Sequence, residues 1–145
     1  MSDPVGVESA VEAATYVGLV ASPKLRAATV EKPAALATVY QHVPQNTAPP
    51  VVIIGDLDAE PFAATKAEDE DQLVTLVVIA VTEGEERKPN LAILRAIKTA
   101  LNGLRVDRDG WSLSFKFLSS DGALLEPGDT YEGRNLFQVT ALKDT

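Results

Sequence analysis

The spacing of apolar residues along the chain predicts two long helices. In residues 4–20 small apolar side chains recur at helical spacing, and Ala, Gly and Val make up most of the stripe. A second stripe, of Leu and Ile, runs from Pro89 to a stop at Asn102-Gly103. Between the two, Ser22 and Pro23 suit the N-cap and first position of a short helix over residues 23–30.

Other segments have the hydrophobic patterns of strands. The strongest is the nearly continuous apolar run 73–81, which predicts a central strand with both faces covered. A β-branched run at 51–54, closed by Gly55, predicts another strand, and residues 36–40 predict a short one. Alternation in 111–117 and 136–142 predicts two strands with one apolar face each, with turns at Asp121-Gly122 and at 127–129.

The polar segments supply the candidate contact residues. Pro and Asn make 41–50 a loop, and 83–88 is a charged loop. Residues 56–71 are acidic and predict a long exposed loop or hairpin arm, a kind of connection that is commonly functional. Phe62 within it either folds back on the core or anchors a partner. The candidate protein-interface residues are Asp58, Glu60, Phe62, Glu68, Asp69, Glu70, Asp71, Glu85, Glu86, Arg87 and Lys88.

The order of these elements is helix, short helix, strands, helix, strands. This order predicts an α+β fold, with a mostly antiparallel mixed sheet and two main helices packed on one face. The 145 residues contain no repeat or linker, so we expect a single domain over residues 1–145.

The composition offers little for catalysis. There is no cysteine, which excludes disulfides, thiolate nucleophiles and sulfur-based metal sites. His42 is the only histidine, and a solvated loop histidine is a better interpretation of it than a catalytic base. The acidic run 68–71 lacks the spacing of a calcium loop, and no phosphate-binding motif occurs. We therefore expect no enzymatic activity, no metal and no cofactor.

Charge and hydropathy disfavour nucleic acid and membranes as partners. A net charge of −8 disfavours tight binding to nucleic acid, because phosphate backbones repel it. No basic segment precedes an apolar one at the start of the chain, so we expect no signal peptide. The longest apolar run, 73–81, is far shorter than the roughly 20 residues of a membrane-spanning helix.

Five segments, taken together in this order, resemble the small tail-completion (tail-terminator) proteins of long-tailed bacteriophages, which are also found in gene transfer agents. The resemblance extends from about residue 7 to 142. The segments are Val-Tyr-Gln-His-Val-Pro at 39–44, Pro-Pro-Val-Val-Ile-Ile-Gly at 49–55, Val-Thr-Leu-Val-Val-Ile at 74–79, Ile-Lys-Thr-Ala-Leu at 97–101 and Tyr-Glu-Gly-Arg-Asn-Leu-Phe-Gln-Val-Thr-Ala at 131–141.

This resemblance implies a structural subunit without cofactor or reaction. It implies a hexameric ring on the end of the tail tube, which stops tube growth and presents a surface to the head or neck. The implied partners are copies of the chain as a homo-hexamer, the tail-tube protein and a head or neck connector protein. The implied location is the tail-neck region of a phage-like particle assembled in the bacterial cytoplasm. The residues alone leave an alternative open, a small cellular ligand-binding module or carboxylate-based enzyme with a pocket between helix and sheet.

Overall fold

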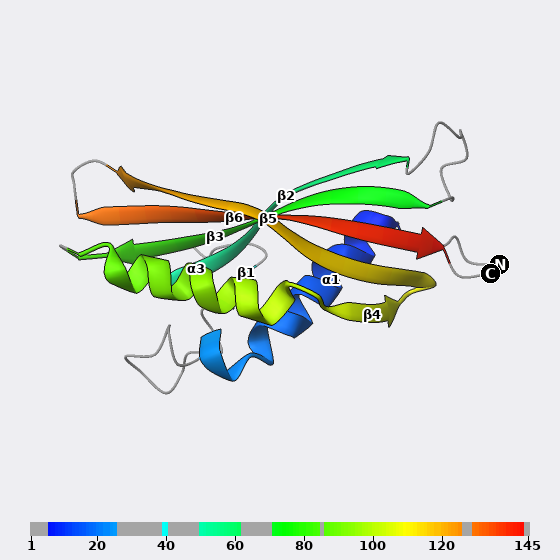
Figure 1. Ribbon diagram of the computed structural model, residues 1–145, viewed down its shortest axis with the longest axis horizontal. Helices are drawn as coiled ribbons and strands as arrows, with labels where there is room; N and C mark the ends of the chain where they lie inside the picture. The colour runs from blue at the N-terminus through cyan, green and yellow to red at the C-terminus, as the bar shows by residue number, and fades with distance from the viewer. Residues whose placement is uncertain are drawn as a thin grey trace.

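A six-stranded sheet carries both main helices on one side (Figure 1). The computed structural model describes residues 6–25, 39–40, 50–61, 71–84, 86–125 and 129–143. The predicted α+β fold with two main helices on one face is confirmed. In chain order the elements are α1 (Val7–Val20), β1 (Val39–Tyr40), β2 (Val51–Pro61), β3 (Gln72–Glu83), α3 (Lys88–Leu101), β4 (Arg105–Arg108), β5 (Trp111–Leu125) and β6 (Thr130–Lys143).

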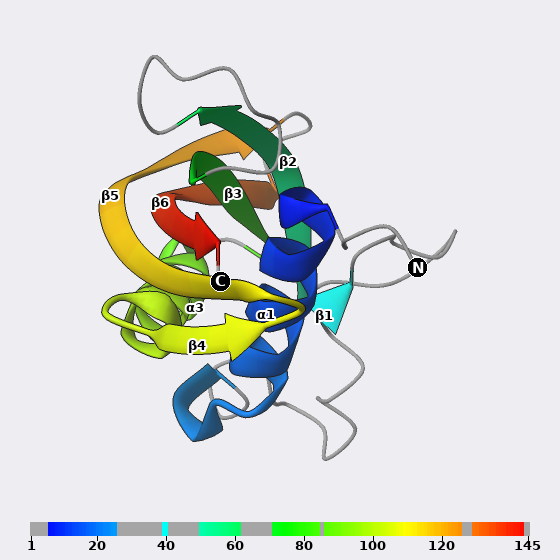
Figure 2. The ribbon, with the colours of Figure 1, turned by 90° about the vertical axis from the view of Figure 1, so that its right-hand side faces the viewer.

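The strand order is β1-β2-β3-β6-β5-β4, and only the β1–β2 pair is parallel. The strand predicted to be central, β3, lies between β2 and β6. The sheet is strongly twisted, and Figure 2 shows the long strand β5 bending through a wide arc. Twist of this kind follows from the handedness of L-amino acids and lets a sheet wrap around the helices on one side.

The core lies between the helices and the sheet face that they cover. In the centre of that face Leu76 pairs with Phe137 across β3 and β6, and the Phe137 ring meets that of Phe117 edge-on at 5.7 Å between centroids. Helix α1 approaches closely because Ala10 and Ala14 on its buried face are small. The residues that α3 contributes are Ile93, Leu94, Ala96, Ile97 and Leu101.

The prediction that both faces of β3 are covered was wrong. The residues that face the helices, such as Val74 and Val78, are fully buried. Their neighbours Val77 and Ile79 point to the other side and are only partly buried, and Thr75 is exposed. Both main helices lie on the same side, so among the described residues no helix lies over the second face of this apolar strand, which we call the uncovered face.

The prediction of a loop from residue 56 was also wrong. Strand β2 continues to Pro61 and pairs with the first half of β3, with a register shift between Ile54 and Leu57. Acidic and apolar positions alternate along residues 56–60, and this is the pattern of a half-buried strand. Cross-strand hydrogen bonding to β3 outweighed the acidity of the segment. Residues 62–70 lie outside the described part.

Two further boundaries differ from the prediction. Asp121 and Gly122 form no turn, because β5 runs through them, and they pair with Arg134 and Gly133 of β6. Strand β4 was missed, since its four residues are too few to show a pattern; it pairs with β5 across a tight turn at 109–110. The charged loop is shorter than predicted, because residue 83 belongs to β3 and residue 88 to α3.

The predicted short helix is confirmed where the structure describes it. Residues 23–25 are helical, and the backbone N–H of Leu25 donates to the Ser22 hydroxyl at 3.2 Å, as an N-cap requires. The rest of the predicted helix lies outside the described residues, as do the loop 41–49 and His42.

Helix α3 is fixed to the sheet by a buried asparagine and a glycine. Asn90 is 2% exposed, and its Nδ2 group donates to the carbonyl oxygens of Ala80 at 3.0 Å and Tyr131 at 3.1 Å, with the Thr82 hydroxyl at 3.3 Å. Gly133 lies beneath it on β6, where a Cβ atom would overlap the side chains of Asn90 and Leu94. The absence of a side chain at 133 thus lets the start of α3 lie directly on the strand.

We expect Gly133→Ala to destabilise the fold by about 1–3 kcal/mol, because the added methyl group forces α3 away from β6. Urea unfolding measures the change. The matched control is Gly122→Ala at the residue paired with Gly133, where a Cβ would lie 3.7 Å from its nearest neighbour. The control should be neutral or slightly stabilising. Equal stabilities of the two variants would contradict this account of α3.

Candidate functional site

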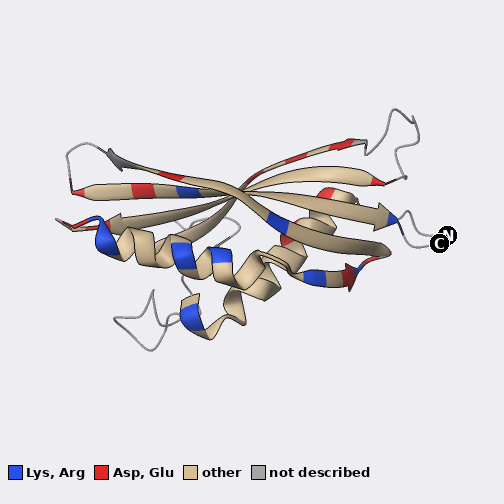
Figure 3. Cartoon of the chain, in the orientation of Figure 1, with Lys and Arg blue, Asp and Glu red and all other residues tan. Residues whose placement is uncertain are grey.

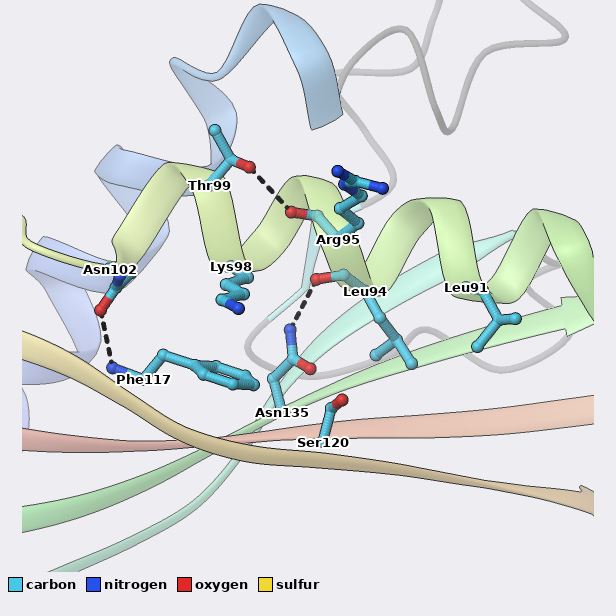
Figure 4. A pocket seen from close by; sticks show the side chains of 9 residues that line it. All are labelled: Leu91, Leu94, Arg95, Lys98, Thr99, Asn102, Phe117, Ser120 and Asn135. Atoms are coloured by element: carbon cyan, nitrogen blue, oxygen red, sulfur yellow. Dashed lines mark hydrogen bonds between the residues drawn. The ribbon is translucent and has the colours of Figure 1, made fainter.

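A pocket of about 680 Å³ lies between α3 and the strands β5 and β6 (Figure 4). Its wall on the helix side consists of residues three or four positions apart, which share one face of α3. Its wall on the sheet side comes from both strands. The lining residues are Leu91, Leu94, Arg95, Lys98, Thr99, Asn102, Phe117, Ser120 and Asn135.

A β-bulge shapes the sheet side of the pocket. The register of β5 against β6 shifts between Phe117 and Ser119, and the backbone N–H of Phe117 donates to Asn102 Oδ1 at 3.0 Å. The end of α3 is therefore tied to the bulge. Beyond the bulge, Ser120 pairs with Asn135, whose side chain reaches α3, so both face the helix. A bulge is a common means of redirecting side chains at a site.

The charges at the pocket are all positive. Arg95 and Lys98 line it, and none of the described lining residues is a carboxylate. Lys98 Nζ lies 4.5 Å from the centroid of the Phe117 ring, within the range of a cation–π contact. Within the described residues, neither Arg95 nor Lys98 forms an ion pair with an acidic side chain. The pocket is therefore arranged to attract an anionic group.

The floor of the pocket holds a buried acceptor without a partner. Asn135 is 1% exposed, and its Nδ2 group donates to the Leu94 carbonyl oxygen at 2.8 Å. Its Oδ1 atom has no hydrogen-bond partner among the described residues. The carbonyl of Leu94 fixes the orientation of the amide, and Figure 4 shows the oxygen turned toward the space between Leu94 and Ser120. A buried acceptor left unpaired costs about 1–3 kcal/mol, so an occupant that brings a donor gains affinity.

A second charged feature lies on β2. Asp56, Asp58 and Glu60 are exposed and form what we call the acidic surface. Residues 51–61 contain no Lys or Arg. Asp58 pairs with Thr75 and lies on the sheet face away from the helices, as does Glu60. Figure 3 shows the acidic positions of β2 in the right half of the view and the basic positions of α3 in the left half.

The predicted interface residues lie in several different places in the structure. Asp58 and Glu60 are exposed on β2. Asp71 contributes to the fold, because its Oδ1 atom accepts a hydrogen bond of 3.0 Å from the backbone N–H of Lys143. Glu86, Arg87 and Lys88 are exposed just before and at the start of α3. The guanidinium group of Arg87 lies 5.4 Å from the centroid of the Tyr131 ring. The predicted residues outside the described part are Phe62, Glu68, Asp69, Glu70 and Glu85.

The sequence interpretation missed the pocket, although a signal existed. Residues 87–105 contain no Asp or Glu, in a chain with 21 acidic residues. The basic residues in that stretch are Arg87, Lys88, Arg95, Lys98 and Arg105. A helix whose charged residues are all basic, in a chain with a negative net charge, indicates a surface that binds a partner. The position of Asn135 beneath this helix had no signal in the sequence.

Metal and membrane sites are not found in the part of the chain that the structure describes. There, no three His, Asp or Glu side chains come close enough together to hold a metal ion. No described helix has the length and apolar composition needed to cross a membrane.

One of three comparisons with known proteins identifies a family. Residues 8–140 match the family described as Tail completion protein gp17. No curated protein matches the chain. Among solved structures, a chain from the virion of a native gene transfer agent particle aligns with a TM-score of 0.79 and 22% sequence identity, covering 94% of this chain and 97% of that one. This structural likeness concerns the fold.

The two buried asparagines should differ in their contribution to stability. We expect Asn90→Ala to destabilise the protein by at least about 1 kcal/mol more than Asn135→Ala. The first change removes a donor with three acceptors, whereas the second also removes the unpaired Oδ1 atom. Thermal and urea unfolding of the two variants provide the comparison. A larger loss for Asn135→Ala would mean that its Oδ1 atom is satisfied after all.

Proposed function

We propose, since this chain belongs to the family of tail completion protein gp17, that it forms a ring that caps the tail tube of a phage-like particle. The family places the chain among the structural proteins of phage-like tails. The ring, its role in ending tube growth and its junction with the head or neck are the proposal. The observation that carries it is the family match over residues 8–140, nearly the whole chain.

The proposed partners are other protein surfaces. They are further copies of this chain, in a homo-hexamer, together with the tail-tube protein and a head or neck connector protein. The chain would lie in the tail-neck region of the particle, and the particle would be assembled in the bacterial cytoplasm. The related fold in a gene transfer agent virion supports a setting of this kind. In this function the chain acts through complementary surfaces, and the proposal needs no catalytic group or cofactor.

The uncovered face of β3 supports an assembly role. An antiparallel sheet with one face toward water usually alternates apolar and polar residues. Here the outward residues are largely apolar and only partly buried, and they lie outside the core formed by the helices and the sheet. A surface of this kind is suited to burial in an assembly. The outward apolar residues around β3 are Ile53, Leu73, Val77, Ile79 and Val81.

The pocket beside α3 keeps ligand binding as a second candidate function. A pocket between helix and sheet is what that alternative required, and the unpaired Oδ1 atom of Asn135 gives it an unused acceptor. The described residues of its lining include no carboxylate, so the pocket does not favour the carboxylate-based enzyme. A chain that stayed monomeric and bound a small anion would favour this second candidate.

We expect the full-length chain, mixed with its tail-tube protein, to form six-membered rings that electron microscopy and mass photometry detect. Val77→Lys on the uncovered face should abolish or strongly weaken ring formation, because a charge at a buried contact is costly. Thermal unfolding checks that the variant is folded. Lys24→Glu changes an exposed charge away from this face and serves as the control. A stable monomer or two-fold dimer with tube protein present would contradict the proposed function.

A further inference from the structure

We propose that neighbouring subunits of the ring meet head to tail, with the acidic surface of β2 on one subunit seated at the basic pocket beside α3 on the next. The basic pocket is the site of Arg95 and Lys98, and the acidic surface is Asp56, Asp58 and Glu60. This inference rests on the proposed ring. The inference adds to the proposed ring the identity of the two contacting surfaces and the head-to-tail direction of the contact.

Charge decides which contacts are possible. The acidic surface carries one sign of charge, so two copies of it repel each other, and the same holds for two basic pockets. A symmetric two-fold contact through either surface is therefore disfavoured. Each surface attracts the other, which is the condition for a heterologous contact between different surfaces of identical subunits. Heterologous contacts can close into rings.

The two surfaces point in different directions, as a head-to-tail contact requires. The basic pocket lies between α3 and the sheet, on the helix side. Asp58 and Glu60 lie on β2, on the opposite face of the sheet. A subunit cannot bring its own acidic surface to its own pocket, because the sheet separates them. One subunit can therefore use both surfaces at once, each with a different neighbour.

Strand β2 carries the chemical groups that the pocket lacks, namely anions and hydrogen-bond donors. The carboxylates of the acidic surface supply anions for Arg95 and Lys98, which have no acidic partner among the described residues. The unpaired Oδ1 of Asn135 needs a donor. Strand β1 pairs only with the beginning of β2, at Val52 and Ile53. Beyond Ile53 no strand among the described residues pairs with the outer edge of β2, and a backbone N–H group of that edge is the donor that we propose for Asn135 Oδ1.

Apolar contact completes the fit. Leu91 at the mouth of the pocket is 53% exposed, a high value for a leucine beside an apolar wall. A seated strand would cover Leu91 and exclude water from the cations. Exclusion of water strengthens the attraction between opposite charges, since the effective dielectric constant falls. Nucleic acid is the other anion that would be drawn to Arg95 and Lys98, but the net charge of −8 opposes it.

Cysteine cross-linking tests the contact directly, because the natural chain has no cysteine. The double variant Asp58→Cys/Lys98→Cys places one thiol on each surface, at positions exposed in the subunit. Under assembly conditions with tube protein, a short bis-maleimide should give a ladder of covalent oligomers up to the closed ring. Each single variant should give no species beyond a dimer. A two-fold contact would end at dimers even with both thiols present.

A charge exchange provides the second test. Arg95→Glu/Lys98→Glu makes both surfaces acidic, and Asp58→Lys/Glu60→Lys makes both basic. Each variant alone should need at least tenfold more protein to form rings, whereas an equimolar mixture should assemble at the wild-type concentration with the two variants alternating. Arg105→Glu, which reverses an exposed cation on β4 outside the pocket lining, should assemble as wild type. Thermal unfolding confirms that all variants are folded.

The outcomes separate this inference from the proposed function. Wild-type rings without the cross-linked ladder, and without sensitivity to charge exchange, would overturn the head-to-tail contact and leave the ring intact. Absence of rings in the wild type with tube protein present would overturn both. A DNA oligonucleotide that binds the wild type but not Arg95→Glu/Lys98→Glu, with ring formation unchanged, would assign the pocket to nucleic acid and overturn the contact.

Discussion

Helix α3 lies directly on β6 because Gly133 has no side chain, and the position of this helix sets most of what surrounds it. Asn90 fixes its first turn to carbonyl groups of β3 and β6, and Asn135 binds the Leu94 carbonyl in its middle. Asn102 then ties its end to the bulge in β5. Three asparagines at the two ends and the middle of one helix hold it at a defined height and angle. Apolar packing alone would hold it less precisely, because dispersion contacts have little directionality.

The pocket is a consequence of that placement. The helix is pinned at both ends, and the bulge between Phe117 and Ser119 alters the course of β5 beneath it. No side chain of the described part of the chain fills the space between them, which is bounded by Arg95 and Lys98. These cations project from a helix whose backbone is already ordered, so an anionic partner has only their side chains to order when it binds. A pocket on rigid elements suits recognition of a protein surface better than one on a loop.

The distribution of charge gives the molecule a direction. Acidic residues follow β2, where Asp58 and Glu60 lie on the face away from the helices, and basic residues follow α3 on the helix side. An antiparallel sheet covered by helices on one side keeps these two surfaces apart and holds them at a fixed relation. A subunit built in this way has two different contact surfaces, which is what a ring of identical subunits with head-to-tail contacts requires. The uncovered apolar face of β3 adds area for further contacts in the same assembly.

The sequence by itself determined the elements whose pattern is strong. The stripe of α3, the apolar run of β3 and the alternation of β5 each fixed an element and its type, since burial of one face selects a single periodicity. It also supported the N-cap at Ser22. The absence of acidic residues from 87–105 was present in the sequence as well, but the sequence interpretation did not use it. Only the tertiary structure decided that residues 56–61 and 121–122 are strand, because there hydrogen bonding to a neighbour overrides local preference for a loop or turn. The same holds for the pocket. Asn135 is distant in sequence from the helix that it binds, and an unpaired buried oxygen arises only when two such segments are brought together, which no local pattern encodes.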